Sequence, residues 1–265
     1  MSNMNPKMNA GAKSKNTSWE NVAGWYDQLL EGEGTYQREL ILPNLLRLMD
    51  INARETILDL ACGQGFFARE FYRKTKRVMG VDASRSLIAL AQKNSPQPLE
   101  FHVAQADALP FIKSGTLDKI AIVLALQNIE NIQAVTKECA RVVRPAGSLY
   151  IVLNHPAFRV PKESSWGWDE KEKVQYRRVD RYLSELKVPI AMHPGKTSTP
   201  YTTSFHRPLQ SYFKALGKAG FAVSGMEEWN SHKKSEPGPR AVAEDIARKE
   251  IPLFLCLTCV KVEVE

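Results

Sequence analysis

Hydrophobic and polar positions along the chain follow two periodicities, one typical of buried strands and one typical of amphipathic helices. The first strand is indicated by the apolar residues Ile57, Leu58 and Leu60. A glycine-containing turn follows it, and a segment of helical character begins at Phe66. Six further strands are predicted, at Arg77–Val81, Leu99–Ala104, Leu117–Leu126, Ser148–Leu153, Phe221–Trp229 and Ile251–Val262.

Helices alternate with these strands, as doubly wound α/β sheets require. Ser84 is expected to cap a helix that contains Leu87–Lys93. Two helices are predicted before the first strand, one from Ser18 to Tyr26 and one that Thr35 caps. The others are Ile132–Val143, followed by a turn at Pro145–Gly147, and Pro208–Ala219, which Gly220 ends.

The chain divides into segments of different composition. Residues 1–17 are rich in Asn, Lys, Gly and Ser and are expected to be disordered. Residues 18–50 are predicted to form the helical lead-in, and 51–265 one α/β domain. Within that domain, 154–207 is too long for a simple connection and must begin and end at the carboxyl edge of the sheet. We expect it to be a lid over a site at that edge.

The stretch T-I-L-D-L-A-C-G-Q-G, residues 56–65, forms a strand, a tight turn and the start of a helix. Gly63 and Gly65 permit backbone conformations that other residues avoid, and such junctions aim backbone N–H groups at one ligand. The spacing Gly63-x-Gly65-x-x-Ala68 also satisfies the dinucleotide fingerprint. Asp59 discriminates between a dinucleotide and a cationic ligand. Its carboxylate would repel a pyrophosphate and attract an ammonium or a sulfonium.

The motif D-L-A-C-G-Q-G resembles the first motif of class I S-adenosylmethionine-dependent methyltransferases, most closely the small-molecule group that includes the ubiquinone and menaquinone methyltransferases. Ala61 stands where many members have glycine. The resemblance implies a Rossmann-like, doubly wound sheet of seven strands, mostly parallel, with the seventh strand antiparallel beside the fifth. It also implies S-adenosylmethionine as cofactor and S-adenosylhomocysteine as product.

Several acids are candidates for holding that cofactor. Asp82 ends the second strand 17 residues after Gly65 (82 − 65), near the offset at which an acid reaches ribose hydroxyls; the alternative is a helix cap at Ser84. The resemblance implies that Asp107 accepts from the adenine amino group and that Tyr26 covers the methionine end. The alternatives are a turn-forming Asp before Pro110 and an aromatic core stripe of Trp19, Trp25 and Tyr26. The full set of expected cofactor-binding residues is Tyr26, Asp59, Ala61, Gly63, Gly65, Asp82, Ala83, Asp107, Ala108 and Leu126.

Catalytic candidates lie at the two ends of the lid segment. His155 and His206 are predicted to converge over the methyl group, one acting as general base; the alternative is that both only bond the lid backbone. Gln127 and Asn128 follow the fourth strand, where members of the family often have a histidine. Five lid aromatics would either enclose an acceptor or form a small core of the insert: Trp166, Trp168, Tyr176, Tyr182 and Tyr201.

Charge and composition change this picture little. The formal net charge is +7, but residues 162–187 hold seven Lys or Arg and six Asp or Glu, which argues against a nucleic-acid partner such as a substrate RNA. No apolar run reaches the ~18 residues of a membrane span, and we expect a cytoplasmic protein. Cys256 and Cys259 would point to opposite faces of a strand, so we expect core packing and no metal site.

The sequence therefore predicts S-adenosylmethionine-dependent methyl transfer to a small aromatic or apolar acceptor. Two alternatives stay open, an NAD(P)-dependent oxidoreductase of Rossmann type and a protein that binds S-adenosylmethionine without catalysis. The oxidoreductase would share the glycine spacing and Asp82 but would give Asp59 and Asp107 no role.

Overall fold

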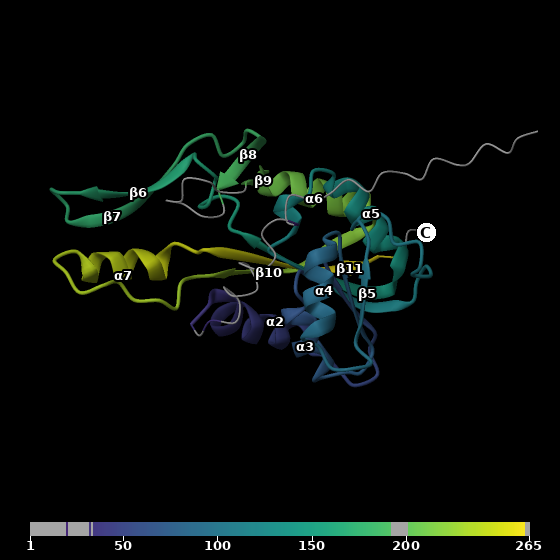
Figure 1. Ribbon diagram of the computed structural model, residues 1–265. Coiled ribbons are helices and arrows are strands. Elements are labelled where there is room, and N and C mark those ends of the chain that lie inside the picture. The colour runs from purple at the N-terminus through teal and green to yellow at the C-terminus, as the bar shows by residue number, and fades with distance from the viewer. Residues whose placement is uncertain (1–19, 21–31, 33, 192–200, 263–265) are drawn as a thin grey trace, which may run out of the picture.

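The centre of the molecule is a seven-stranded sheet with strand order β10-β11-β5-β4-β1-β2-β3 (Figure 1). The computed structural model describes residues 20, 32, 34–191 and 201–262. Strands β1 to β5 run parallel, whereas β11 is antiparallel to both β5 and β10, which confirms the predicted sheet. The strands are β1 Ile57–Leu60, β2 Val78–Asp82, β3 Glu100–Val103, β4 Leu117–Val123, β5 Val143–Asn154, β10 Phe221–Trp229 and β11 Phe254–Lys261.

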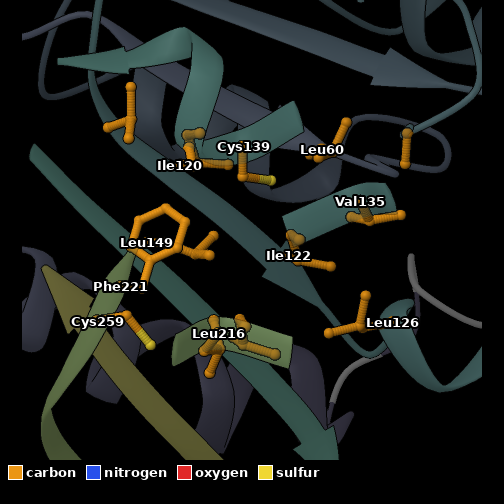
Figure 2. Close-up of a cluster of buried hydrophobic side chains, with 14 of the residues drawn as sticks. Leu60, Ile120, Ile122, Leu126, Val135, Cys139, Leu149, Leu216, Phe221 and Cys259 are labelled. Atoms are coloured by element: carbon orange, nitrogen blue, oxygen red, sulfur yellow. The ribbon is translucent and has the colours of Figure 1, made fainter. Parts of the chain in front are cut away.

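Helices cover both faces of this sheet, because each turns an apolar stripe inward. One face packs against α2 (Leu42–Met49), α3 (Phe66–Tyr72) and α4 (Arg85–Lys93). The other packs against α5 (Ile132–Val142) and α6 (Leu209–Lys218). Figure 2 shows this second core, in which side chains of β4, β5, α5 and α6 meet. A π-helical turn, Gln37–Ile41, leads directly into α2.

The four cysteines are free and buried. Cys259 lies in the core under α5 and α6, whereas Cys256 lies in the core on the opposite face of the sheet. The period of two along β11 therefore separates the two thiols, as predicted.

Local signals set several element boundaries. The Ser84 side chain accepts a hydrogen bond from the Leu87 amide at 3.2 Å and so caps α4. Gly65 begins α3 at φ 81°, and Gly220 follows α6 at φ 86°, both in the left-handed region that glycine tolerates.

Two expected boundaries differ from the structure. The predicted Pro145–Gly147 turn lies inside β5, where the pairing with β4 jumps from Val143 to Ser148 and Ala146 takes φ 57°. β4 ends at Val123 because Leu124 turns into the left-handed region at φ 53°, and a short 3-10 turn, Leu126–Asn128, replaces the end of the predicted strand.

The expected lid contains two β-hairpins. One pairs β6 (Ser164–Asp169) with β7 (Val174–Val179), and the other pairs β8 (Leu186–Ala191) with β9 (Tyr201–His206). The first hairpin extends from the body beside α7 (Ala241–Glu250), a helix that the sequence pattern had not indicated (Figure 1). An ion pair of 2.8 Å between Arg240 and Glu170 connects the two.

The predicted tail at 1–17 and, apart from Glu20, the predicted Ser18–Tyr26 helix lie outside the described residues. The second lead-in helix is present as the continuous segment from Gln37 to Met49. Among the helices of the described chain, none has both the length and the apolarity that crossing a bilayer requires.

Candidate active site

A cavity of about 260 Å³ opens at the carboxyl ends of β1, β2 and β4. We call it the first cavity. Parallel α/β sheets bind their ligands at this edge. Its walls combine apolar side chains, among them Phe66, Phe67 and Leu87, with six of the residues expected to hold a cofactor: Asp59, Ala61, Gly63, Asp82, Ala83 and Asp107.

Asp59, on β1, is the most unusual of these acids, because only 1% of its surface is exposed. Burial raises the pKa of its carboxyl to about 7, although a hydrogen bond from the Ala68 amide at the start of α3 lowers it. Its Oδ2 atom has no hydrogen-bond partner in the described chain. A buried polar atom without a partner at the wall of a cavity favours a ligand that supplies one, and a carboxylate favours a cation.

Asp82 ties the glycine turn to the end of β2. Its Oδ2 accepts from the Gly63 amide at 2.9 Å, and its Oδ1 accepts from the Ser84 amide at 2.8 Å. Burial raises the pKa of this carboxyl as well. A carboxylate offers about four acceptor positions, so Asp82 keeps capacity for a ligand hydroxyl beside its hydrogen bonds from the Gly63, Ser84 and Ala83 amides. Support of the turn and ligand binding are compatible roles.

Glu20 is a contributor that the sequence reasoning missed. Its Oε2 accepts from the Ser84 hydroxyl at 2.7 Å, and its Oε1 accepts from the amide and the hydroxyl of Ser86 at 3.1 and 2.8 Å. The hydrogen bond from Ser84 is the largest influence on Glu20 and lowers the pKa of its carboxyl. Glu20 thus attaches the chain at this position to the first turn of α4, beside the Ala83 wall of the cavity.

Four expected cofactor residues are not placed in the wall of the first cavity. A Cβ on Gly65 would lie 2.8 Å from the Phe101 ring, so Gly65 faces β3 and is needed for packing and for its positive φ. Leu126 is fully buried in the core, and Ala108 is exposed. Tyr26 lies outside the described residues.

Two residues of the wall have backbone conformations that are uncommon for side-chain-bearing residues. Ala61 has φ 59° and Leu124 has φ 53°. The Leu124 carbonyl accepts from the side-chain amides of Gln127 at 2.8 Å and Asn128 at 3.3 Å. Such conformations concentrate at binding sites, where the surrounding contacts hold them in place.

A second cavity, of about 420 Å³, adjoins the first at Leu124 and Asn128. The lid forms much of its wall, through side chains that are mostly polar. These are Asn154, Arg159, Lys162, Ser164, Arg177, Thr202 and Ser204, and Gln37 and Gln127 add to the polar lining.

The five lid aromatics line neither cavity in the described structure. Trp166 lies under the Arg177 guanidinium and Trp168 under that of Arg240, at 5.2 and 4.6 Å from the ring centroids. Tyr201 is 59% exposed. The Tyr182 hydroxyl accepts from the Leu209 amide at 3.0 Å. Their contacts are therefore within the hairpins and with α6 and α7.

His155 is buried, and both of its ring nitrogens are engaged. Nδ1 accepts from the amides of Ala157 and Phe158 at 3.2 and 3.3 Å, so Nε2 carries the proton and donates to Glu228 at 2.7 Å. Burial lowers the pKa of this imidazole, against the raising effect of Glu228. His155 borders neither cavity in the structure, and its contacts match the structural alternative considered above.

His206 is also buried, at the end of β9. Its Nε2 donates to the Tyr182 carbonyl at 2.8 Å, which leaves Nδ1 as the unprotonated nitrogen. Burial lowers the pKa of its imidazole and keeps the ring neutral near pH 7. It lines a small cavity of about 30 Å³ that shares Gln127, Asn154 and Arg159 with the second cavity. The structure does not bring His155 and His206 together at one cavity.

Sequence comparison identifies the part of the chain that carries this site. Residues 58–151, from β1 to β5, match the family described as "Methyltransferase domain". These residues are similar to a methyltransferase domain. They contain the first cavity's glycine turn, Asp82 and Asp107, whereas the two lid hairpins follow them in sequence.

Curated relatives align over the same region. The biotin biosynthesis bifunctional protein BioHC of Cellvibrio japonicus is 26% identical over 139 residues, which cover 52% of this chain and 27% of that protein. The demethylmenaquinone methyltransferase of Oceanobacillus iheyensis is 26% identical over 141 residues, or 51% of this chain and 59% of the relative. The chain therefore matches less than two thirds of the length of either relative.

A solved structure shares the fold over most of the chain. An S-adenosylmethionine-dependent methyltransferase from Mesorhizobium loti superimposes with a TM-score of 0.64 at 24% identity, covering 82% of this chain and 96% of its own. At this identity the likeness establishes a common fold.

Proposed function

We propose that this chain transfers a methyl group from S-adenosylmethionine to a small acceptor with an aromatic or apolar body. The observation that carries the proposal is the partnerless Oδ2 of Asp59 at the wall of the first cavity. A carboxylate there attracts the ammonium and sulfonium of S-adenosylmethionine and repels the pyrophosphate of a nicotinamide dinucleotide. This argues for methyl transfer over the oxidoreductase alternative, which shares the fold class.

In this proposal each acid of the first cavity binds a different part of the cofactor. Asp59 binds the cationic end, Asp82 accepts from the ribose hydroxyls with its remaining lone pairs, and Asp107, exposed at the rim, accepts from the adenine amino group. The bound cofactor supplies a methyl group that its sulfonium has already activated. The contribution of the chain is then orientation of the two reactants and exclusion of water.

The second cavity is where we place the acceptor, since it meets the first at Leu124 and Asn128. An aromatic or apolar body agrees with the relative whose name specifies demethylmenaquinone as its substrate. If the attacked atom carries a proton, His206 is the better-placed of the two histidine candidates, because its Nδ1 is unprotonated and it lines the small cavity next to the acceptor.

We further propose that residues 51–265 are the catalytic unit, with 154–207 as its lid. The four buried, free cysteines agree with a reducing compartment such as the cytoplasm.

Turnover separates this proposal from cofactor binding without catalysis. The chain would be incubated with methyl-labelled S-adenosylmethionine and a panel of hydroquinones, phenols and aromatic acids. We expect label in an organic product together with an equal amount of S-adenosylhomocysteine. Binding of S-adenosylhomocysteine with no labelled product across the panel would instead support a non-catalytic binding protein.

A further inference from the structure

The second cavity is rich in positive charge. Arg159, Lys162 and Arg177 line it, and no Asp or Glu is among its lining residues in the described chain. Arg177 projects from β7 and Arg159 from the segment between β5 and β6, so two separate parts of the lid bring guanidinium groups to one space.

Neither cavity arginine has a carboxylate partner in the described structure. Arg159 donates from Nη1 to the Asn154 side-chain oxygen at 2.9 Å. Arg177 donates from Nε to the Phe158 carbonyl at 2.8 Å and from Nη2 to the Ser164 hydroxyl at 2.7 Å. Burial lowers the pKa of both guanidinium groups, and Arg177 lowers that of Arg159 further by repulsion.

The neighbouring arginine on the same hairpin is paired with a carboxylate. Arg178, the next residue along β7, is exposed and forms an ion pair of 3.0 Å with Asp180. Removing a guanidinium from water is costly, and proteins normally compensate a half-buried charge with an opposite one. Arg159 and Arg177 thus contact neutral acceptors and one aromatic ring each, Phe254 and Trp166, with no ion pair in the described chain. An anionic ligand in the cavity can supply the opposite charge.

We propose that the methyl acceptor carries an anionic group, a carboxylate or a phosphate, that binds to Arg159 and Arg177 in the second cavity. This inference rests on the proposed function and specifies its substrate class. The planar fork of arginine binds both kinds of anion through two parallel hydrogen bonds. The apolar body of the acceptor would contact Val160 and Ile190, while Leu124 and Asn128 lead from the anion site to the first cavity.

Three small probes of similar shape test this site: benzoate, phenyl phosphate and the neutral benzamide. Each would be titrated into protein saturated with S-adenosylhomocysteine. We expect at least one anion to bind at least tenfold more tightly than benzamide, and the tighter of the two anions tells a carboxylate site from a phosphate site. Equal affinity for the anions and the amide, or no binding of either anion, would overturn the inference.

Arginine substitutions test which residues bind the anion. Arg159→Gln and Arg177→Gln should each weaken binding of the preferred anion at least tenfold, whereas Arg178→Gln should leave it unchanged. Parental affinity for the anion in both cavity variants would also overturn the inference. If one of the two cavity variants does not fold, the other variant still tests the anion site. The comparison of the anions with benzamide tests it as well.

The same titrations test cofactor binding and anion binding separately. All three variants should bind S-adenosylhomocysteine as the parent does, because none of the three arginines lines the first cavity. A parent that does not bind S-adenosylhomocysteine contradicts the proposed function. A parent that binds it but does not prefer anions contradicts only the anion site.

Discussion

At the scale of single residues, the ionisation of Asp59 decides what the first cavity attracts. Its pKa of about 7 means that about a tenth of the carboxyl groups are ionised at about pH 6 and about nine tenths at about pH 8. A cationic ligand binds the ionised form. We therefore expect affinity for S-adenosylhomocysteine, which carries an ammonium, to rise by about tenfold across this range, as measured by calorimetric titration.

The matched variant is Asp59→Asn, which cannot ionise. Its affinity should be weaker than that of the parent at about pH 8 and flat across the range. A parental affinity that does not change with pH would show that Asp59 does not interact with the cationic end of the ligand.

The raised pKa of Asp59 destabilises the folded protein when no ligand is bound. The folded carboxyl keeps its proton up to about pH 7, whereas the unfolded one releases it near pH 4, so stability falls as the pH rises between these values. Without ligand, Asp59→Asn should therefore raise the melting temperature at about pH 8, with the difference from the parent shrinking toward about pH 5. A lower melting temperature for the variant at both pH values would mean that the carboxylate is structurally required.

Substitutions of Ala61 test whether the left-handed backbone conformation at this residue is strained. Replacing it by glycine removes the steric cost of φ 59° but increases the entropy of the unfolded chain, so we expect the free energy of unfolding to change by less than about 1 kcal/mol. A β-branched residue is a stronger outlier there, and Ala61→Val should lower the free energy of unfolding by more than about 1 kcal/mol. Urea unfolding measures both. Equal stability of the two variants would contradict this account of the turn.

Residue patterns predicted which strand ends carry the acids, but not which way each side chain faces. Asp59 and Asp82 follow directly from their positions at the ends of β1 and β2. Gly65 was assigned to the ligand by its spacing, yet the ring of Phe101, 36 residues later (101 − 65), occupies the space beside it. A spacing motif contains no information on such long-range packing.

At the scale of elements, prediction succeeded where an apolar stripe was strong. The limits of β10 match the prediction, those of α5 differ by one residue at one end, and those of α6 differ by one residue at each end. Both helices bury a clear apolar face. The lid hairpins were missed as strands, since β7 buries little and its sequence, V-Q-Y-R-R-V, has no apolar alternation. Strands of this kind are specified by cross-strand pairing, which the local sequence does not reveal.

A pair of glycines tests how tightly the elements pack. A Cβ at Gly80, in the middle of β2, would lie 2.5 Å from the Phe101 ring and 3.1 Å from the Cys62 sulfur. Gly80→Ala should therefore overpack the core and lower the free energy of unfolding by about 1–3 kcal/mol.

Gly217 provides the control. It lies near the end of α6 with no atom within 4 Å of an added Cβ, so Gly217→Ala should raise the free energy of unfolding by about 0.5–1 kcal/mol through helix propensity. Urea unfolding of both variants compares them directly. A Gly80→Ala protein as stable as the Gly217→Ala protein would show that the Phe101 ring moves aside without lowering the free energy of unfolding.

At the scale of the whole molecule, the doubly wound α/β class could be predicted because strands and helices alternate along the chain. The reversed β11 came from the family resemblance, since period and composition do not give strand direction. The anion-binding side of the second cavity could not be predicted. Arg159 and Arg177 are ordinary members of the lid sequence, and only the fold brings both to a cavity that no Asp or Glu of the described residues lines.

The central claim is that the first cavity holds S-adenosylmethionine and not a nicotinamide dinucleotide. Calorimetric titration of the full chain with S-adenosylhomocysteine and, separately, with NADH tests it most directly. We predict saturable one-to-one binding of S-adenosylhomocysteine that an excess of NADH does not displace. Binding of NADH together with no heat from S-adenosylhomocysteine would contradict the account.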